Sequence, residues 1–153
     1  MAFQLQWTIE GVPELSRRLI GLDGDLKDLR YPFRQSADYL RGVFSRDVFQ
    51  TQGRAIGEQW KRLSPYTVAQ KARRGYPSTP LIGSGAMQNS FQTLVSSDQA
   101  VVYNTAAYFK FHQSRKGPRV RLPRRVMMKL ADRQKESIMR FFQEHLQASL
   151  HRP

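Results

Sequence analysis

The sequence predicts an α+β fold, in which two long amphipathic helices pack on a small, mainly antiparallel sheet and long basic loops emerge from it. Three observations predict this fold. Two stretches carry apolar residues at helical spacing, several short stretches carry strand and turn patterns, and the middle of the chain is basic and rich in glycine and proline. With 153 residues, the chain is expected to form one domain over residues 1–153.

The N-terminal third predicts a strand followed by two helices. Apolar and polar residues alternate over Phe3–Ile9, which is typical of a half-buried strand. A helix is expected over residues 12–29, with Pro13 at its first position. The stronger helical pattern lies over residues 32–49, where one face carries Phe33, Ala37, Leu40, Phe44 and Val48.

The middle of the chain predicts a long loop with one short helix in it. Residues 51–84 are dense in glycine, proline and polar residues, and such a stretch in a compact domain is usually functional or becomes ordered on assembly. A helix is expected over Pro65–Arg73, because Ser64 is a suitable N-cap and proline is favoured at the first helical position.

The remaining elements are a hairpin, a short helix and the second long helix. Strands are expected at Phe91–Val95 and Ala100–Tyr103, joined by a serine- and aspartate-containing turn, with a short helix over Ala106–Gln113. Residues 114–125 read as an extended loop. The last helix falls within residues 127–150 and is followed by a flexible tail at 149–153; its apolar side includes Leu130, Gln134, Ile138, Phe141, Phe142, His145 and Leu146.

Most of the net charge of +13 lies in one part of the chain. Residues 59–131 hold thirteen Lys or Arg and one acid, Asp98, whereas residues 1–58 hold eight of each sign. A localised basic excess attracts polyanions, and arginine's planar fork suits fixed contacts with carboxylates or phosphates. The candidate interaction residues, which dock a partner or face DNA, are Arg73, Arg74, Arg115, Lys116, Arg119, Arg121, Arg124 and Arg125.

The residues needed for catalysis are largely missing where the charge lies. The chain has no cysteine, and residues 59–131 contain one histidine and one acid, so neither a catalytic site, a cofactor site nor a metal site is expected. His112 follows Tyr108, Phe109 and Phe111 and is expected to end an apolar element, bonding to backbone or to a neighbouring chain. The sequence therefore predicts a protein that is not an enzyme.

The apolar runs are only a few residues long, whereas about 20 are needed to span a bilayer. The absence of cysteine suits a reducing compartment. The sequence therefore predicts a soluble intracellular protein without a membrane partner.

Four short motifs follow one another in the sequence, none of them specific alone. They are formed by Trp60, Leu63, Ser64, Pro65 and Thr67; by Leu81, Ser84, Gly85, Met87 and Ser90; by Tyr108, His112 and Gln113; and by Leu122, Pro123, Arg124, Arg125, Val126, Met127 and Met128. In this order they resemble the phage virion morphogenesis family, the tail-completion or neck proteins of Mu-like and P2-like tailed phages, over roughly residues 30–145. The glycine that this family usually carries after His-Gln is displaced to Gly117 here.

The resemblance implies a structural protein that completes the phage tail or joins it to the DNA-filled head. It implies a ring of identical subunits, expected to be a hexamer, assembled in the cytoplasm of the bacterial host and placed in the virion at the neck, the head-proximal end of the tail. The implied partners are the tail terminator or tail tube and the head connector, with non-specific contact to packaged DNA left open. The structural motif residues are then Trp60, Gly85, His112, Gln113 and Pro123.

A small nucleic-acid-binding protein is the alternative interpretation. Tyrosines and phenylalanines lie among the bases, and aromatic rings beside arginines can stack on nucleobases. Against it, the sequence has no helix-turn-helix, zinc-finger or RNP pattern. We therefore expect Arg115–Arg125 to dock a protein, while contact with DNA stays open.

Overall fold

The structure is a computed structural model that describes residues 3–7, 28–114 and 122–150. The predicted helix over residues 12–29 lies outside these ranges, except for its last two residues, which are not helical. Besides two short 3₁₀ turns, Arg54–Ile56 and Gln88–Ser90, the elements are β1 (Phe3–Trp7), α2 (Arg30–Gly42), a π-helical turn (Val43–Asp47), α3 (Val48–Gln50), α4 (Pro65–Arg73), β2 (Phe91–Val95), β3 (Ala100–Asn104), α5 (Phe109–Gln113) and α6 (Asp132–Leu150).

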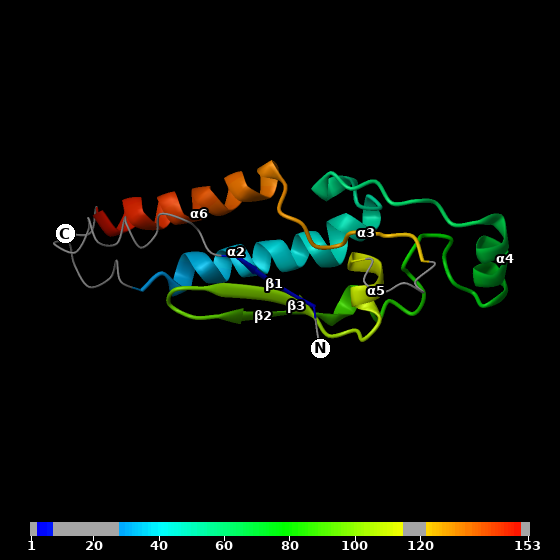
Figure 1. The fold of residues 1–153 in the computed structure, drawn as a ribbon. Helices are drawn as coiled ribbons and strands as arrows, with labels where there is room; N and C mark the ends of the chain where they lie inside the picture. The colour runs from blue at the N-terminus through cyan, green and yellow to red at the C-terminus, as the bar shows by residue number, and fades with distance from the viewer. Residues whose placement is uncertain (1–2, 8–27, 115–121, 151–153) are drawn as a thin grey trace.

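The molecule is layered, with α2 lying between the sheet and α6 (Figure 1). Toward α6, Phe33 meets Phe142 edge to face at 4.9 Å between ring centroids. Toward the sheet, Phe44 and Phe49 lie near Phe91 of β2, at 6.3 and 6.4 Å. The predicted α+β class is therefore confirmed, but only one of the two long helices packs directly on the sheet. The long helix formed by α2 and α3 packs against both α6 and the sheet because it carries buried apolar residues toward each of them.

The first long helix follows the predicted pattern closely. All five residues of its predicted apolar face are buried: Phe33, Ala37, Leu40, Phe44 and Val48. The helix runs without a break from α2 into α3 through the π-helical turn, where the Val48 N–H bonds to the Val43 carbonyl. Phe49, next to Val48, is also fully buried. A π turn inserts one extra residue and so changes which residues face the core beyond it.

The sheet has three antiparallel strands in the order β1-β3-β2. The predicted hairpin is confirmed, with Phe91 opposite Asn104 and Val95 opposite Ala100, and β3 extends one residue beyond the prediction. β1 pairs with the other side of β3, Leu5 opposite Val102. Alternate residues of β3 are buried, so one face of the sheet covers α2.

Asn104 at the end of β3 is fully buried and directs the chain into the next turn. Its side-chain amide donates to the Met87 carbonyl at 2.8 Å, and its side-chain oxygen accepts from the Ala106 N–H at 2.9 Å. Because a buried polar side chain must be hydrogen-bonded, these two bonds hold the turn that leads to α5. α5 is shorter than predicted and begins at Phe109.

α6 is the predicted second long helix and lies within the predicted range 127–150, beginning at Asp132. It continues through Leu150, and the Ser149 hydroxyl donates to the His145 carbonyl at 3.0 Å, so the first two residues of the predicted tail are helical. Residues 151–153 lie outside the described ranges. Within those ranges, no helix combines the length and the apolar character that crossing a membrane requires.

The turn after α3 depends on a glycine. Gly53 has φ +88°, and a Cβ there would stand 1.7 Å from the Glu58 carbonyl oxygen and 2.6 Å from the Trp60 ring. The same turn carries bonds from the Glu58 N–H to the Gly53 carbonyl and from the Trp60 N–H to the Gln52 carbonyl, both 2.9 Å. The turn therefore sets Trp60 against the end of α3, and only glycine fits.

We expect Gly53→Ala to lower the free energy of unfolding by about 3 kcal/mol or more, because a left-handed φ alone costs about 1–2 kcal/mol and the clash adds to it. Gly57→Ala is the matched control: Gly57 has φ +73°, but a Cβ added there would meet nothing within 4 Å, so only the conformational cost of about 1–2 kcal/mol applies. Urea unfolding measures both, and equal losses would contradict the role of the close approach.

Candidate interaction surface

The segment between α5 and α6 is buried without belonging to a helix or strand. Val126, Met127 and Met128 are all buried, and residues 123–131 form no regular element. Buried backbone groups must be hydrogen-bonded, so this segment requires partners from elsewhere in the chain. Side chains from two distant parts of the sequence provide them.

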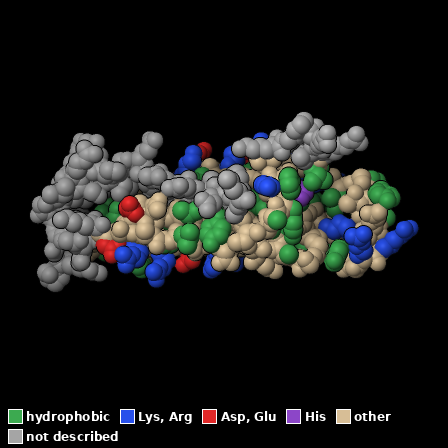
Figure 2. All heavy atoms as spheres, turned by 60° about the horizontal axis from the view of Figure 1, so that its bottom comes forward, with side chains coloured by type: hydrophobic (Ala, Val, Ile, Leu, Met, Phe, Trp, Pro, Cys, Tyr) green, Lys and Arg blue, Asp and Glu red, His purple; other side chains and the backbone are tan. Residues whose placement is uncertain are grey.

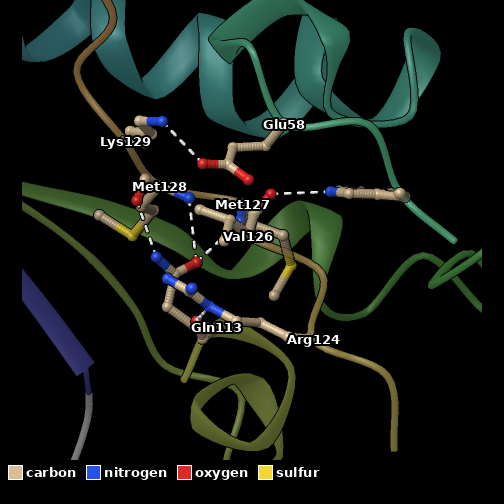
Figure 3. Close-up of polar contacts among 8 residues, drawn as sticks. Glu58, Gln113, Arg124, Val126, Met127, Met128 and Lys129 are labelled. Carbon is tan, nitrogen blue, oxygen red and sulfur yellow. Dashed lines mark hydrogen bonds and ion pairs between the residues drawn. The ribbon is translucent and has the colours of Figure 1, made fainter. Parts of the chain in front are cut away.

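Gln113 at the end of α5 is the first of these partners (Figure 3). Its side-chain oxygen accepts from the N–H groups of Met127 and Met128, at 2.7 and 3.0 Å. Its side-chain amide donates to the Met128 carbonyl at 2.7 Å. One buried side chain thus satisfies three backbone groups, as a neighbouring strand would.

Residues 58–61 are the second partner. The indole N–H of Trp60, itself buried, donates to the Val126 carbonyl at 2.7 Å. Lys129 pairs with Glu58 at 2.7 Å on the surface (Figure 3). We call the meeting of residues 58–61, 112–113 and 124–129 the three-segment joint. It locks together three pieces that are far apart in the sequence.

Arg125 belongs to the interior of this joint, which corrects its predicted role. It was expected to be an exposed docking residue, but it is only 5% exposed. Its guanidinium donates twice to the Lys61 carbonyl, from Nε at 3.1 Å and from Nη2 at 2.9 Å, and its backbone N–H bonds to the His112 carbonyl. Burial lowers the pKa of Arg125, although an arginine still keeps its charge at neutral pH.

The charge of Arg125 affects two neighbouring basic groups. Burial, and secondly the charge of Arg125, lower the pKa of His112. The same two causes lower the pKa of Lys71. His112 Nδ1 is buried without a hydrogen-bond partner among the described residues, so the expected bond to backbone is not seen at that atom. Arg125 therefore lies close enough to disfavour the protonated forms of both His112 and Lys71.

A second basic segment leaves the joint at Lys61. We call residues 61–84 the α4 arm; α4 lies at the end of the molecule in Figure 1. Ser64 caps α4 as predicted, accepting from the Thr67 N–H at 3.2 Å, and the helix has the predicted bounds. Lys71 Nζ holds the arm's return by donating to the carbonyls of Thr79 and Ile82.

The other predicted interaction residues fall into two groups. Arg73, Arg74 and Arg124 are exposed, and none of them forms an ion pair within the described ranges; Arg124 Nε donates to the Gln113 carbonyl at 3.2 Å. Figure 2 shows Lys and Arg side chains at the end that carries α4, while the acidic side chains in view lie in the other half. The remaining four lie outside the described residues: Arg115, Lys116, Arg119 and Arg121.

The structural motif residues also separate. Trp60, His112 and Gln113 meet in the joint, and Pro123 leads into it half-buried. Gly85, with φ +84°, belongs to another turn, the one before β2. Sequence reasoning missed the roles of Gly53, Asn104 and Lys71. The left-handed turn at Gly53 had a local signal in its glycine, but the partners of Asn104 and Lys71 had none.

Large exposed aromatic rings accompany the basic residues. Tyr66 and Tyr76 on the α4 arm are 72% and 41% exposed, and Tyr108 and Phe111 beside the joint are 45% and 39% exposed. Lys110 Nζ lies 5.2 Å from the centre of the Phe111 ring. Tyrosine, phenylalanine and arginine are enriched at protein interfaces, so this composition is typical of a binding surface. In the described part of the chain, no cluster of three or more His, Cys, Asp or Glu side chains could hold a metal ion.

Compared with known protein families, residues 11–147 match the phage virion morphogenesis family. The matched range contains the residues of all four motifs and is longer than residues 30–145, over which the motifs indicate the resemblance. Comparisons with curated proteins and with solved structures found no match.

The joint predicts unequal roles for two buried glutamines. Gln113→Leu should lower the free energy of unfolding by about 3 kcal/mol or more, because it leaves three buried backbone groups unpaired and each costs about 1–3 kcal/mol. Gln134 on α6 is equally buried but donates only to the Ala55 carbonyl, at 3.1 Å, and its side-chain oxygen has no partner among the described residues. Gln134→Leu should therefore cost about 1 kcal/mol or less. Similar losses in urea unfolding would refute the special role of Gln113.

His112 predicts a dependence of stability on pH. Since its pKa in the folded protein lies below the ordinary 6.5, the unfolded chain binds a proton more readily at acidic pH. Stability from this group is complete above pH 6.5 and falls as the pH drops toward the lowered pKa. His112→Gln should remove this part of the pH dependence, measured as the difference from wild type in urea unfolding free energies on both sides of pH 6.5. A constant difference would contradict the assignment.

Proposed function

Because this chain belongs to the phage virion morphogenesis family, we propose that it is a structural subunit that completes the tail or joins it to the DNA-filled head. Its role in virion morphogenesis follows from the family; the place at the neck is our proposal. The subunits form a closed ring, expected to be a hexamer, and catalyse no reaction. The ring meets the tail terminator or tail tube on one side and the head connector on the other.

The observation that carries this proposal is that two basic segments both extend from the hydrogen-bonded three-segment joint. The α4 arm leaves the joint at Lys61, and the basic loop 114–125 both leaves it after Gln113 and returns to it at Arg124. Where these segments leave the joint, the chain is held by hydrogen bonds to the buried side chains of Gln113 and Arg125. A rigid base that presents basic side chains suits docking on acidic partners, because little ordering is required at the base.

The unequal ends of the molecule support a ring. A closed ring needs two different surfaces on each subunit, since head-to-tail contacts close by rotation. Here the α4 end is basic and rich in exposed tyrosine, whereas the long helices and their flanks hold nearly balanced charge. Contact of the basic residues with packaged DNA is the second possibility, through phosphates and without base readout.

The proposal is tested by deleting the gene from the phage that encodes it and supplying variants in trans. Arg73→Glu with Arg74→Glu should reduce infectious particles about tenfold or more, because charge-assisted contacts become repulsive. Electron microscopy should then show heads and tails that are not joined, or tails left incomplete. Arg34→Glu with Arg140→Glu, two exposed arginines on the long helices, is the control with the same change of charge and should restore particles.

Normal particle numbers from the deletion itself would overturn the proposed function. A purified protein that stays monomeric in light scattering and binds none of the neck or tail proteins would also contradict it. Binding to duplex DNA that weakens steeply with salt but persists at physiological ionic strength would favour the nucleic-acid role instead.

A further inference from the structure

A groove separates the α4 arm from the turn that follows α3. Its volume is about 690 Å³, within the range of roughly 300–1,000 Å³ that is usual for binding pockets. Residues of the turn, of the arm and of the chain that links them all line it. The groove is lined by Gln52, Arg54, Gln59, Trp60, Arg62, Leu63, Val68, Ser78 and Pro80.

The residues that line the groove combine positive charge with a small apolar surface. Arg54 and Arg62 are both exposed, no acid lines the groove, and neither arginine forms an ion pair within the described ranges. Arg54 uses only Nε, at 3.3 Å from the Thr51 carbonyl. Leu63 and Val68 are half-buried and contribute apolar surface, whereas Trp60 is only 2% exposed; glutamine and serine side chains offer further hydrogen bonds. Such a site matches a ligand that carries carboxylates beside an apolar side chain.

Both walls are held before any ligand binds. The Trp60 N–H bonds to the Gln52 carbonyl at 2.9 Å, and its indole N–H bonds to Val126 at 2.7 Å. On the other side, Lys71 ties α4 to the returning chain at Thr79 and Ile82. Because the groove is preformed, a ligand pays little of the ordering cost that weakens binding to a flexible loop.

We propose that this groove binds a short acidic segment of a partner virion protein, with its carboxylates on Arg54 and Arg62 and an apolar side chain against Leu63 and Val68. The inference rests on the proposed function and identifies the surface and the chemistry of the contact. It adds a docking groove beside the α4 arm to the predicted docking loop 114–125.

Charge and shape favour this occupant over two others. A DNA duplex is a wide rod whose phosphates contact protruding basic side chains, and a hollow of about 690 Å³ is too small to receive it. A second copy of this chain carries a net charge of +13, so its approach to a basic groove is opposed by like-charge repulsion. An acidic segment of a different protein offers carboxylates to both arginines and an apolar side chain to Leu63 and Val68.

The test measures fluorescence anisotropy of a short labelled peptide made of aspartates around one leucine. The wild-type protein should bind it at least about tenfold more tightly than the same peptide with asparagine in place of aspartate. Arg54→Glu with Arg62→Glu should weaken binding by about tenfold or more, and Arg54→Gln with Arg62→Gln should also weaken it. Arg34→Glu with Arg140→Glu changes the net charge equally and should alter binding less than about threefold. Circular dichroism verifies that each variant is folded.

Several results would overturn the proposal. These are equal binding of the acid and amide peptides, equal weakening by the groove and control variants, displacement of the peptide by duplex DNA that depends on Arg54 and Arg62, and self-association lost in the groove variants alone. Complementation separates this inference from the proposed function: if Arg54→Glu with Arg62→Glu restores joined particles while the deletion produces none, the groove assignment fails and the proposed function stands.

Discussion

The buried, irregular chain from Val126 to Met128 is the constraint on which the rest of the structure depends. It has the burial of a core strand but no neighbouring strand, so its backbone groups must be paired by side chains. Gln113 and Trp60 do this, and each is committed to its position by the bonds it makes. The joint that results fixes where α5 ends, where the chain enters α6, and where the α4 arm leaves the body.

A buried cation follows from the same arrangement. Arg125 is buried because it belongs to this buried segment, and its guanidinium donates to the Lys61 carbonyl. Its charge then opposes protonation of His112 and Lys71. The basic middle of the chain thus has two kinds of cation. Some hold the joint and the arm together, whereas others, such as Arg73 and Arg74, are free to meet a partner.

Much of the fold was predictable because its signals are local. The spacing of Phe33 to Val48 follows from helix geometry, Ser64 before Pro65 from capping, and the hairpin from two short strands around a turn. The π-helical turn, the pairing of β1 with β3 and the position of α6 outside α2 were not predicted. The strand pairing and the position of α6 depend on contacts between residues distant in the sequence, for which periodicity carries no information. The π-helical turn is local, but the apolar spacing of the helix does not reveal it.

By itself, the sequence determined the fold class, the helix faces, the basic middle and the four motifs that indicate the family, because these are properties of residues and their spacing. Only the tertiary structure decided which basic residues reach the surface. Arg124 and Arg125 are adjacent and alike in sequence, yet one is exposed and the other is 5% exposed. The difference arises because the Arg125 guanidinium donates to the Lys61 carbonyl inside the joint, which Trp60 and Gln113 hold together. The groove of Arg54 and Arg62 likewise exists only once the arm is folded back against the body.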